Sequence, residues 1–304
     1  MPDRAKISKA VIPAAGLGTR MLPATKVLPK EMLPVAGKPL IHYAIEELVA
    51  SGIDSIILVV RNQKSLVQSH FERDLALESS LESRNLAAAA EELRRLSDIV
   101  NLQFVEQHQP LGLANAVCCA RPLLGGESFF VLLPDVIMVN ADPVARQMIQ
   151  VHASRGGSVV AIREIEAKDV DRHGIVEVEH TTATASGAAV RITGLVEKPS
   201  LGAAPSRLGV FGRYVLEPAI WEAIEQTAPD ARGEIQLTDA LNLLCKNNSL
   251  FGLYFQGQHY DAGDPFGYFK ANIDLSLRDP HLRQPCLEYL SRLQTSDANV
   301  TLGK

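Results

Sequence analysis

Runs of apolar, β-branched residues alternate with segments of helical periodicity through the first half of the chain, and this alternation narrows the possible folds more than any other feature. Residues 55–60 (Ser-Ile-Ile-Leu-Val-Val) have the character of a strand buried on both faces. Ahead of them, apolar residues at 41, 44, 45, 48 and 49 recur at helical spacing, and Gly52 ends the predicted helix. Further along, the sequence predicts a helical pair at 64–96, a helix at about 113–123 and a strand at 128–134 that ends before Asp135. Asp261 is expected in a turn after an apolar strand, predicted at 250–256. Buried strands joined by crossover helices are typical of a parallel sheet, so the sequence predicts an α/β fold.

The pattern changes after residue 156, where alternating polar and apolar residues predict strands at 158–164, 174–180 and 189–197. Such strands favour a mixed or antiparallel arrangement. We therefore predict a Rossmann-like, doubly wound mixed sheet with a smaller β-rich part and terminal helices. Residues 1–304 are expected to form one domain with halves at about 9–155 and 156–275, and residues from about 276 to 304 a terminal helix and frayed tail.

Charge and hydropathy exclude several classes of protein. The formal net charge is −5, from 30 basic and 35 acidic residues, and aromatic residues make up 5%, which argues against a nucleic-acid partner. No apolar stretch approaches the roughly 20 residues that span a bilayer, so no membrane association is expected. The first ten residues carry charges where an export signal has an apolar core, which predicts a cytoplasmic location. The four cysteines include an adjacent pair and no Cys-x-x-Cys, which favours reduced thiols inside helices.

The segment VIPAAGLGTRMLPATKVLPKEMLP places two glycines directly after the first predicted strand, where backbone can approach a phosphate. It lacks the third glycine of a dinucleotide-binding fingerprint, because Met21 stands there, and it lacks the Gly-Lys-Ser/Thr of a P-loop. Taken alone, Gly16-Leu17-Gly18 fits a plain tight turn equally well. Arg20 and Lys30 favour a polyphosphate ligand, since a fork-shaped donor and a point charge suit phosphate oxygens, although both are also compatible with solvated surface cations.

Seven further motifs share a recognisable order with this loop. They are P-K-E-M-L-P, Q-H-Q-P-L-G-L-A-N-A-V (107–117), L-L-P-D (132–135), V-E-K-P (196–199), F-G-R-Y (211–214), G-E-I-Q-L-T-D-A (233–240) and Y-D-A-G (260–263). Together with G-L-G-T-R they resemble the sugar-1-phosphate nucleotidyltransferase family, and the P-K-E-M-L-P form is similar to its bacterial UTP:glucose-1-phosphate uridylyltransferases. The resemblance covers residues 9 to about 275.

The resemblance implies a nucleotidyltransferase fold of the glycosyltransferase-A-like type, with the 9–155 half mainly binding nucleotide and the 156–275 half mainly binding sugar. It implies transfer of a uridylyl group from UTP to α-D-glucose 1-phosphate, which gives UDP-glucose and pyrophosphate, with Mg²⁺ as cofactor. Members of the family are typically homo-oligomeric, so a homodimer or homotetramer is expected. The apolar terminal segments 265–277 and 281–293 are candidate contact elements.

The resemblance also assigns the site residues. Arg20, Lys30 and Lys198 match catalytic positions; Ala14, Ala15, Gly16, Gly18, Thr19, Glu31, Gln107 and Gly112 match nucleotide-binding positions; and Gly174, Glu197, Lys198 and Gly212 match sugar-binding positions. Asp135 and Asp261 match metal ligands. The residues themselves leave alternatives open: either aspartate also suits a helix cap, Glu197 and Lys198 a solvated surface pair, and Gly174 and Gly212 bulge or turn glycines. Gln109 is a competing amide for Gln107, with a spacing of three rather than five residues to Gly112.

Three positions depart from the family pattern, namely His173 in place of Tyr, Asn115 in place of His and Ala262 in place of Cys. They leave the sugar preference open, and His173 is expected to be a loop or packing residue. The alternatives are a nucleotidyltransferase that uses dTTP or another hexose 1-phosphate, and a non-catalytic regulator that binds nucleotide sugars. A dinucleotide-dependent oxidoreductase is a third class, which the missing glycine disfavours.

Overall fold

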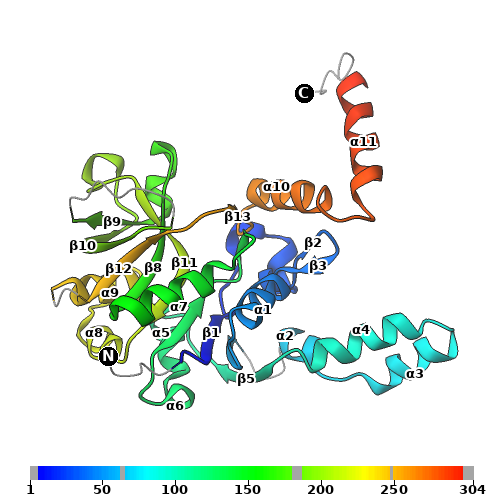
Figure 1. Ribbon diagram of the computed structural model, residues 1–304, viewed down its shortest axis with the longest axis horizontal. Coiled ribbons are helices and arrows are strands. Elements are labelled where there is room, and N and C mark those ends of the chain that lie inside the picture. Colours follow the sequence, from blue (N-terminus) through cyan, green and yellow to red (C-terminus); the bar gives the residue numbers. More distant parts are fainter. Residues whose placement is uncertain (1–5, 62–65, 180–186, 247–248, 297–304) are drawn as a thin grey trace.

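The protein is described here by a computed structural model, which defines residues 6–61, 66–179, 187–246 and 249–296. A nine-stranded sheet runs through the molecule (Figure 1). In spatial order its strands are β5 (Asn101–Glu106), β4 (Ser55–Val60), β1 (Lys9–Pro13), β6 (Phe129–Leu132), β11 (Leu208–Leu216), β8 (Ser158–Glu164), β12 (Leu250–Tyr254), β10 (Ala189–Glu197) and β9 (Gly174–Val178).

Strand directions divide this sheet into two parts. The strands β5, β4, β1 and β6 are parallel neighbours, as the apolar runs of the first half predict. From β11 onward the sheet is mixed, because β11 is antiparallel to β6 and β8, β12 is parallel to β8, and β10 is antiparallel to β12 and β9. The predicted mixed α/β sheet is therefore confirmed.

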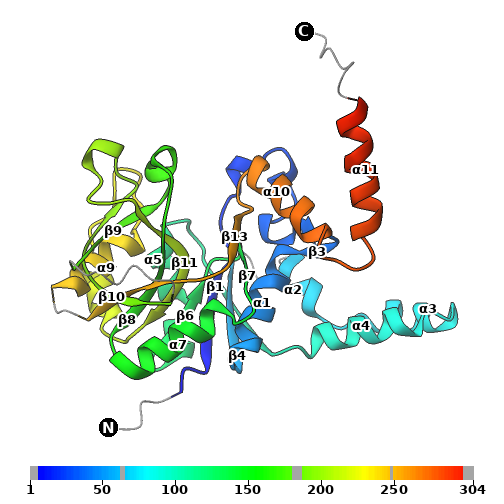
Figure 2. The same cartoon turned by 45° about the horizontal axis from the view of Figure 1, so that its top comes forward.

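Helices cover both faces of the sheet (Figures 1 and 2). One face carries α1 (Leu40–Ala50) and α7 (Val144–Arg155), whose buried residues pack with Ile12 and Leu58. The other carries α5 (Leu113–Cys119), α6 (Arg121–Leu124), α8 (Ile220–Gln226) and α9 (Leu237–Cys245), which pack with Val11 and Ile57. Since successive residues of a strand point to opposite faces, β1 and β4 supply both apolar layers, and each fully buried Ile or Leu contributes roughly 1.5–3 kcal/mol.

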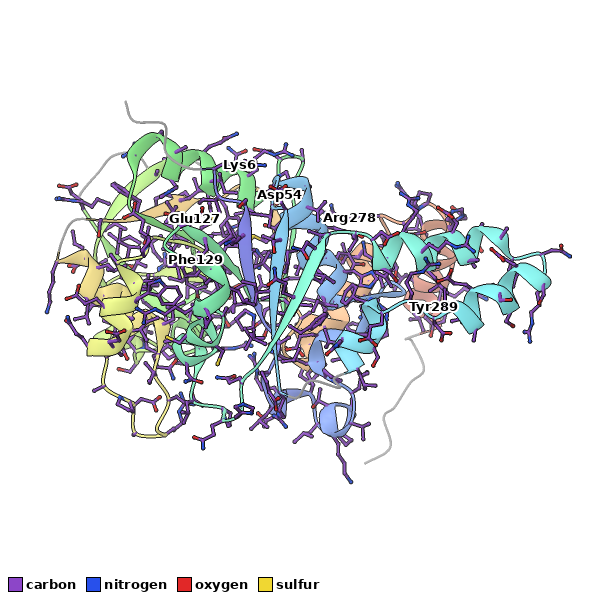
Figure 3. The ribbon with its side chains drawn as sticks, turned by 90° about the horizontal axis from the view of Figure 1, so that it is seen from below. Lys6, Asp54, Glu127, Phe129, Arg278 and Tyr289 are labelled. Carbon is purple, nitrogen blue, oxygen red and sulfur yellow. The ribbon has the colours of Figure 1, made fainter. Side chains whose placement is uncertain are left out.

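Aromatic packing fixes α8 against the sheet. Phe129 of β6 lies among the side chains of that layer in Figure 3, and its ring stacks on Trp221 with centroids 5.1 Å apart and planes inclined by 9°. The single helix expected from Leu113 to Leu123 is in fact α5 and α6, which meet at Ala120. Pro122 explains the break, because its ring fits only the first turn of a new helix.

A helical arm leaves the body between β4 and β5. The expected pair at 64–96 is three helices, α2 (Leu66–Phe71), α3 (Leu75–Ser83) and α4 (Ala87–Ser97), and residues 64 and 65 lie outside the described ranges. In Figure 1, α3 and α4 project together from the molecule. Glu78, which is 3% exposed, holds them by ion pairs to Arg73 and Arg94.

Short elements that sequence reasoning missed lie beside the sheet. Strands β7 (Val136–Val139) and β13 (Gln258–Asp261) form an antiparallel pair, as do β2 (Pro34–Val35) and β3 (Lys38–Pro39). Five 3₁₀ turns are defined: η1 (Thr19–Met21), η2 (Ala24–Lys26), η3 (Lys30–Met32), η4 (Ala167–Arg172) and η5 (Leu201–Ala203). Asp261 therefore ends a short strand of its own rather than following β12 directly.

The chain closes with α10 (Pro265–Ser276) and α11 (Arg283–Ser296). Asp264 caps α10 by accepting from the backbone N–H groups of Phe266 and Gly267, and α11 projects away from the body (Figure 2). The tail expected to fray includes residues 297–304, which lie outside the described part. Among the described helices, none has the length and apolar character needed to span a bilayer. All four cysteines are free thiols within helices, which confirms that prediction.

Candidate active site

The phosphate-loop candidate starts at the carboxyl end of β1, between the parallel neighbours β4 and β6. The Ala14 N–H donates to the Val59 carbonyl at 2.7 Å, which fixes the start of the loop against β4. Gly18 has a φ of +62°, and the Thr25 hydroxyl donates to its carbonyl at 2.7 Å. This left-handed conformation favours glycine. Thr19 and Arg20 follow in η1, and both are exposed.

Two carboxylates meet above this loop. Asp135 follows β6, and Asp261 is paired with Val136 in the antiparallel register of β13 and β7. The Ala262 N–H also donates to the Asp135 carbonyl at 2.8 Å. A Cβ built on Gly263 would lie 2.8 Å from Nη2 of Arg20, 2.9 Å from Oδ2 of Asp135 and 3.0 Å from Oδ1 of Asp261, so these side chains converge on one point beside bare backbone.

Cations neutralise both carboxylates. The Lys30 Nζ donates to Oδ2 of Asp135 at 2.7 Å, and Nη1 of Arg20 lies 3.9 Å from Oδ2 of Asp261. Burial opposes the charged form of Asp135, but the charges of Lys30 and Arg20 outweigh it and lower the pKa of this carboxyl. Burial likewise opposes a charged Lys30, but Asp135 and Glu31 raise its pKa overall. The pair is therefore ionised at neutral pH.

Arg172, which sequence reasoning did not single out, reaches the same cluster from η4. Its Nη2 lies 3.5 Å from Oδ2 of Asp261 and forms an ion pair with Asp264. Its position two residues before Gly174 was the available signal, since that glycine was already assigned to the sugar site. The guanidinium thus connects η4 with the turn that carries Asp261.

The donor set fits a divalent cation that is shared with a substrate. Asp135 and Asp261 supply two carboxylate ligands beside Gly263. Within the described ranges there is no group of three or more His, Cys, Asp or Glu side chains suited to a metal. Mg²⁺ prefers oxygen ligands and is commonly held by one or two carboxylates together with phosphate oxygens and water. A site of this composition suits a metal–nucleotide complex better than a closed structural metal.

The candidate base-reading residues lie together at the end of β5. Gln107 is 6% exposed, its backbone N–H donates to Val60, and its side-chain Nε2 donates to the Asn115 Oδ1 at 2.8 Å and the Gly112 carbonyl at 3.3 Å. Gly112 has a φ of +93°, and a Cβ there would lie 2.7 Å from the Ile235 carbonyl. The competing Gln109 is exposed. Asn115, one of the departures from the family pattern, therefore orients the Gln107 amide.

Glu31 is buried next to Lys30. Its side chain is 1% exposed, and neither carboxylate oxygen has a hydrogen-bond partner. Burial raises the pKa of this carboxyl to about 7, against the opposing charge of Lys30. An unpaired buried acid is costly, so this position is poised to take a proton or to bind a hydrogen-bond donor.

The candidate sugar-binding residues gather where β9 and β10 pair. Glu197 lies opposite Gly174 in this register, and its two oxygens accept from Lys198 Nζ and the Thr238 hydroxyl, each at 2.7 Å. A Cβ on Gly174 would lie 3.0 Å from the Thr238 hydroxyl oxygen and 3.4 Å from Glu197 Oε2. Thr238 is a second residue that the sequence did not single out, although it belongs to the G-E-I-Q-L-T-D-A motif.

Lys198 and Gly212 both have left-handed backbone. Lys198 has a φ of +41°, unusual for a residue with a side chain, and such strain tends to occur at functional sites. Gly212 in β11 has a φ of +60°, and a Cβ there would lie 3.0 Å from Cβ of Leu133, in the segment that carries Asp135.

A buried tyrosine and a half-buried histidine lie near these groups. Burial and the charges of Glu197 and Asp135 raise the pKa of Tyr214, which places both carboxylates within electrostatic range of one phenol. His173 packs on Phe211 at 5.2 Å between ring centroids, and its Nδ1 lies 3.0 Å from the Asp169 carbonyl oxygen, which confirms it as a packing residue.

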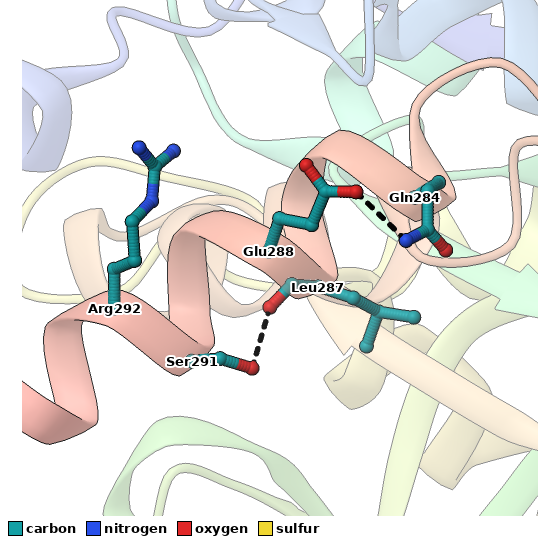
Figure 4. Close-up of a pocket in the computed structure, with 5 residues that line it drawn as sticks. All are labelled: Gln284, Leu287, Glu288, Ser291 and Arg292. Carbon is teal, nitrogen blue, oxygen red and sulfur yellow. Dashed lines mark hydrogen bonds between the residues drawn. The ribbon is translucent and has the colours of Figure 1, made fainter.

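A hollow on α11 is unrelated to this cluster. It is lined by Gln284, Leu287, Glu288, Ser291 and Arg292, all from one helix (Figure 4). Gln284 donates to Glu288 at 2.8 Å and the Ser291 hydroxyl to the Leu287 carbonyl at 2.9 Å, both within the helix. Binding sites are usually built from convergent groups of several elements, and the strand-end cluster meets that description while the hollow does not.

The candidate site lies at the carboxyl ends of β1, β5 and β6, beside the carboxylates of Asp135 and Asp261. This arrangement defines a nucleotide-dependent α/β protein. The chain belongs to the nucleotidyl transferase family, whose sequence model matches residues 9–277. The UTP–glucose-1-phosphate uridylyltransferase YngB of Bacillus subtilis is 41% identical over 287 residues, which cover 94% of this chain and 95% of that protein.

Solved structures agree with this assignment of the family. A UTP-bound UGPase from Acinetobacter baumannii superposes with a TM-score of 0.87 at 38% identity, covering 94% of this chain and 99% of that one. A UDP-glucose pyrophosphorylase complexed with UDP-glucose gives a TM-score of 0.79 at 34% identity, covering 90% of this chain and all of the other (100%). The nucleotidyltransferase fold expected from the motifs is therefore confirmed.

Proposed function

We propose that the protein is a UTP–glucose-1-phosphate uridylyltransferase, which converts UTP and α-D-glucose 1-phosphate into UDP-glucose and pyrophosphate. The convergence of Arg20, Asp135 and Asp261 on the bare backbone of Gly263 carries this proposal. Full-length similarity to relatives named for this activity supports the choice of UTP and glucose 1-phosphate.

A phosphate oxygen of glucose 1-phosphate attacks the α-phosphorus of UTP in line with the bond to the leaving group. The bond between the α-phosphorus and the bridging oxygen breaks, and that oxygen leaves with pyrophosphate. The reaction needs no covalent intermediate with the protein, so the side chains mainly align the reactants and neutralise the growing charge. Arg20 and Lys30 suit this second task on the UTP phosphates, and Lys198 suits it on the sugar-linked phosphate.

The remaining residues orient the two substrates. Since Nε2 of Gln107 already donates to Asn115 and Gly112, its Oε1 is the atom that can accept from the uracil N–H, beside the Gly112 backbone. Glu31 lies on the nucleoside side, and the backbone of Ala14, Ala15, Gly16, Gly18 and Thr19 borders the phosphates. Glu197 accepts from sugar hydroxyls, with Gly174 and Gly212 lying against the glucosyl group.

Asp135 and Asp261 are the side chains that would hold Mg²⁺. Mg²⁺ held there would act as a Lewis acid and stabilise negative charge on the α-phosphate. Lys30, Arg20 and Arg172 pair with these carboxylates. The same three cations would turn to the substrate phosphates if Mg²⁺ took their place on the carboxylates.

A panel of substrates tests the proposal. Purified protein is assayed for pyrophosphate release with UTP or dTTP, each with glucose or galactose 1-phosphate, with Mg²⁺ and with EDTA. We expect the fastest release with UTP and glucose 1-phosphate and none with EDTA. Negligible release from that pair would contradict the proposed reaction, and binding of UDP-glucose without turnover would support a regulator instead. The cytoplasmic location and the homo-oligomer stay predictions.

A further inference from the structure

One charged side chain in the core lies outside the roles assigned above. Arg213 is 1% exposed and makes an ion pair with Glu47, whose side chain is 8% exposed. Burying two charges is expensive, and well-packed apolar residues in their place are often at least as stable. The pair therefore calls for an explanation other than stability.

The guanidinium of Arg213 holds the segment that carries Asp135. Its Nη1 donates to the Leu133 carbonyl at 3.1 Å and its Nη2 to the Val136 carbonyl at 2.8 Å, so the two bonds flank Pro134 and Asp135. The Leu133 N–H also donates to the Gly212 carbonyl at 2.8 Å. Gly212 and Arg213, two consecutive residues of β11, thus fix Leu133 and Val136 on either side of the Pro134–Asp135 pair.

Glu47 holds the guanidinium from the other side. Nε and Nη2 of Arg213 donate to Oε2 of Glu47 at 3.2 and 2.7 Å. The Oε1 of Glu47 also accepts from the Ala145 N–H at 3.2 Å, at the start of α7. Because α1 and α7 both pack on the sheet, the guanidinium cannot move without disturbing two helices.

A local irregularity in β11 accompanies this contact. The pairing of β11 with β8 shifts between Val210 and Tyr214, while Arg213 stays in register with Leu132 of β6. Bulges re-aim side chains near active sites, and the left-handed Gly212 lies inside this one. The bulge therefore lies where the chain brings Arg213 to the β6–β7 turn.

We propose that Arg213, held by Glu47, is a positioning residue that fixes the Asp135 carboxylate for the divalent cation. Residues that orient a metal ligand commonly change metal affinity or activity by about 10–100-fold when they are replaced. The inference rests on the proposed function in one respect, since it takes Asp135 as a ligand of that cation.

The test compares the double variant Arg213→Met/Glu47→Leu with the wild type. It removes both buried charges and keeps similar volume, while the Leu133 and Val136 carbonyls lose their donor. Mn²⁺ binding is measured by the EPR signal of the free ion, with Asp135→Asn as the reference for a lost ligand, and turnover is measured separately. We expect Mn²⁺ to bind at least about tenfold more weakly and kcat to fall by a similar factor.

Leu124→Ala provides the matched control, because it opens a cavity at a fully buried residue of α6 and should lower stability without changing Mn²⁺ affinity. If the double variant does not fold, Arg213→Lys replaces it, since a single ammonium lacks the fork that joins Glu47 to two carbonyls. A folded variant with wild-type Mn²⁺ affinity and kcat would overturn the proposal, as would a wild type that binds no Mn²⁺. A wild type that binds Mn²⁺ but makes no UDP-glucose would refute only the proposed uridylyl transfer. The test of Arg213 would remain valid, because it compares the Mn²⁺ affinities of the variant and the wild type.

Discussion

Replacing Asp135 with asparagine perturbs the proposed centre with the smallest change in shape. Asp135 accepts from Lys30 at 2.7 Å, with the two side chains 14% and 20% exposed, and it lies at the point where Arg20 and Asp261 converge. The amide keeps one oxygen acceptor but removes the negative charge. A charged contact made in the transition state is worth about 2–4 kcal/mol, so kcat should fall by about 30- to 1,000-fold.

Stability should change much less than turnover. Lys30 loses a charged hydrogen-bond partner but retains the neutral amide, so we expect the free energy of unfolding to fall by about 1–3 kcal/mol. Turnover is measured by pyrophosphate release at saturating UTP, glucose 1-phosphate and Mg²⁺, and stability by urea denaturation followed by circular dichroism. Asp142→Asn is the control, since Asp142 pairs with Arg146 on the surface. A folded Asp135→Asn variant with more than a third of wild-type kcat would refute the assignment of Asp135.

Three further perturbations test other parts of the account. Lys198→Ala should lower kcat/KM for glucose 1-phosphate at least tenfold with an unchanged circular dichroism spectrum; near-normal kinetics would exclude a phosphate contact. Glu31→Gln should raise stability above pH 7 by up to about 3 kcal/mol, because the buried carboxyl holds its proton up to about pH 7 while the unfolded chain loses it near 4.5. In the wild type, the stabilising effect of the buried Glu31 carboxyl is complete below pH 4.5 and lost as the pH rises through 7. Urea denaturation of the wild type in which the free energy of unfolding shows no such decline would contradict the buried state of Glu31. Gly263→Ala places a methyl group within 3.0 Å of three site side chains and should reduce turnover at least about tenfold, whereas Gly126→Ala, with open space around it, should not. Equal turnover in the two alanine variants would argue against convergence at Gly263.

The parallel half of the sheet could be predicted because its strands are continuous apolar runs. Residues 55–60 were predicted with their final bounds, and Asp135 could be placed at a strand end from the run before it. Strand β13 could not, because Gln-His-Tyr-Asp carries no apolar run, and β7 is apolar but separated from β6 only by residues 133–135, so it does not stand out as a strand of its own. The convergence of the two aspartates on Gly263 depends on that pairing, so only the structure brings them together.

The residues that the sequence missed have partners far along the chain. Glu47 and Arg213 are separated by 166 positions, and Arg172 and Asp261 by 89. An isolated arginine in a motif carries no information about which carbonyl or carboxylate it will meet. Gln107 and Gly112 could be paired in advance because their spacing of five residues matches that of the family the motifs resemble. Local spacing thus predicts local contacts, while ion pairs between elements follow from the assembled sheet.

The position of the metal relative to the α-phosphate tests the central proposal most directly. Crystals grown with Mn²⁺ and a UTP analogue whose α–β bridging oxygen is replaced by carbon would reveal the metal by anomalous scattering. We expect one peak within coordination distance of Asp135, Asp261 and an α-phosphate oxygen, with Arg20 and Lys30 on the phosphates. An analogue bound with its phosphates away from both aspartates, or a metal bound elsewhere, would contradict the proposed site.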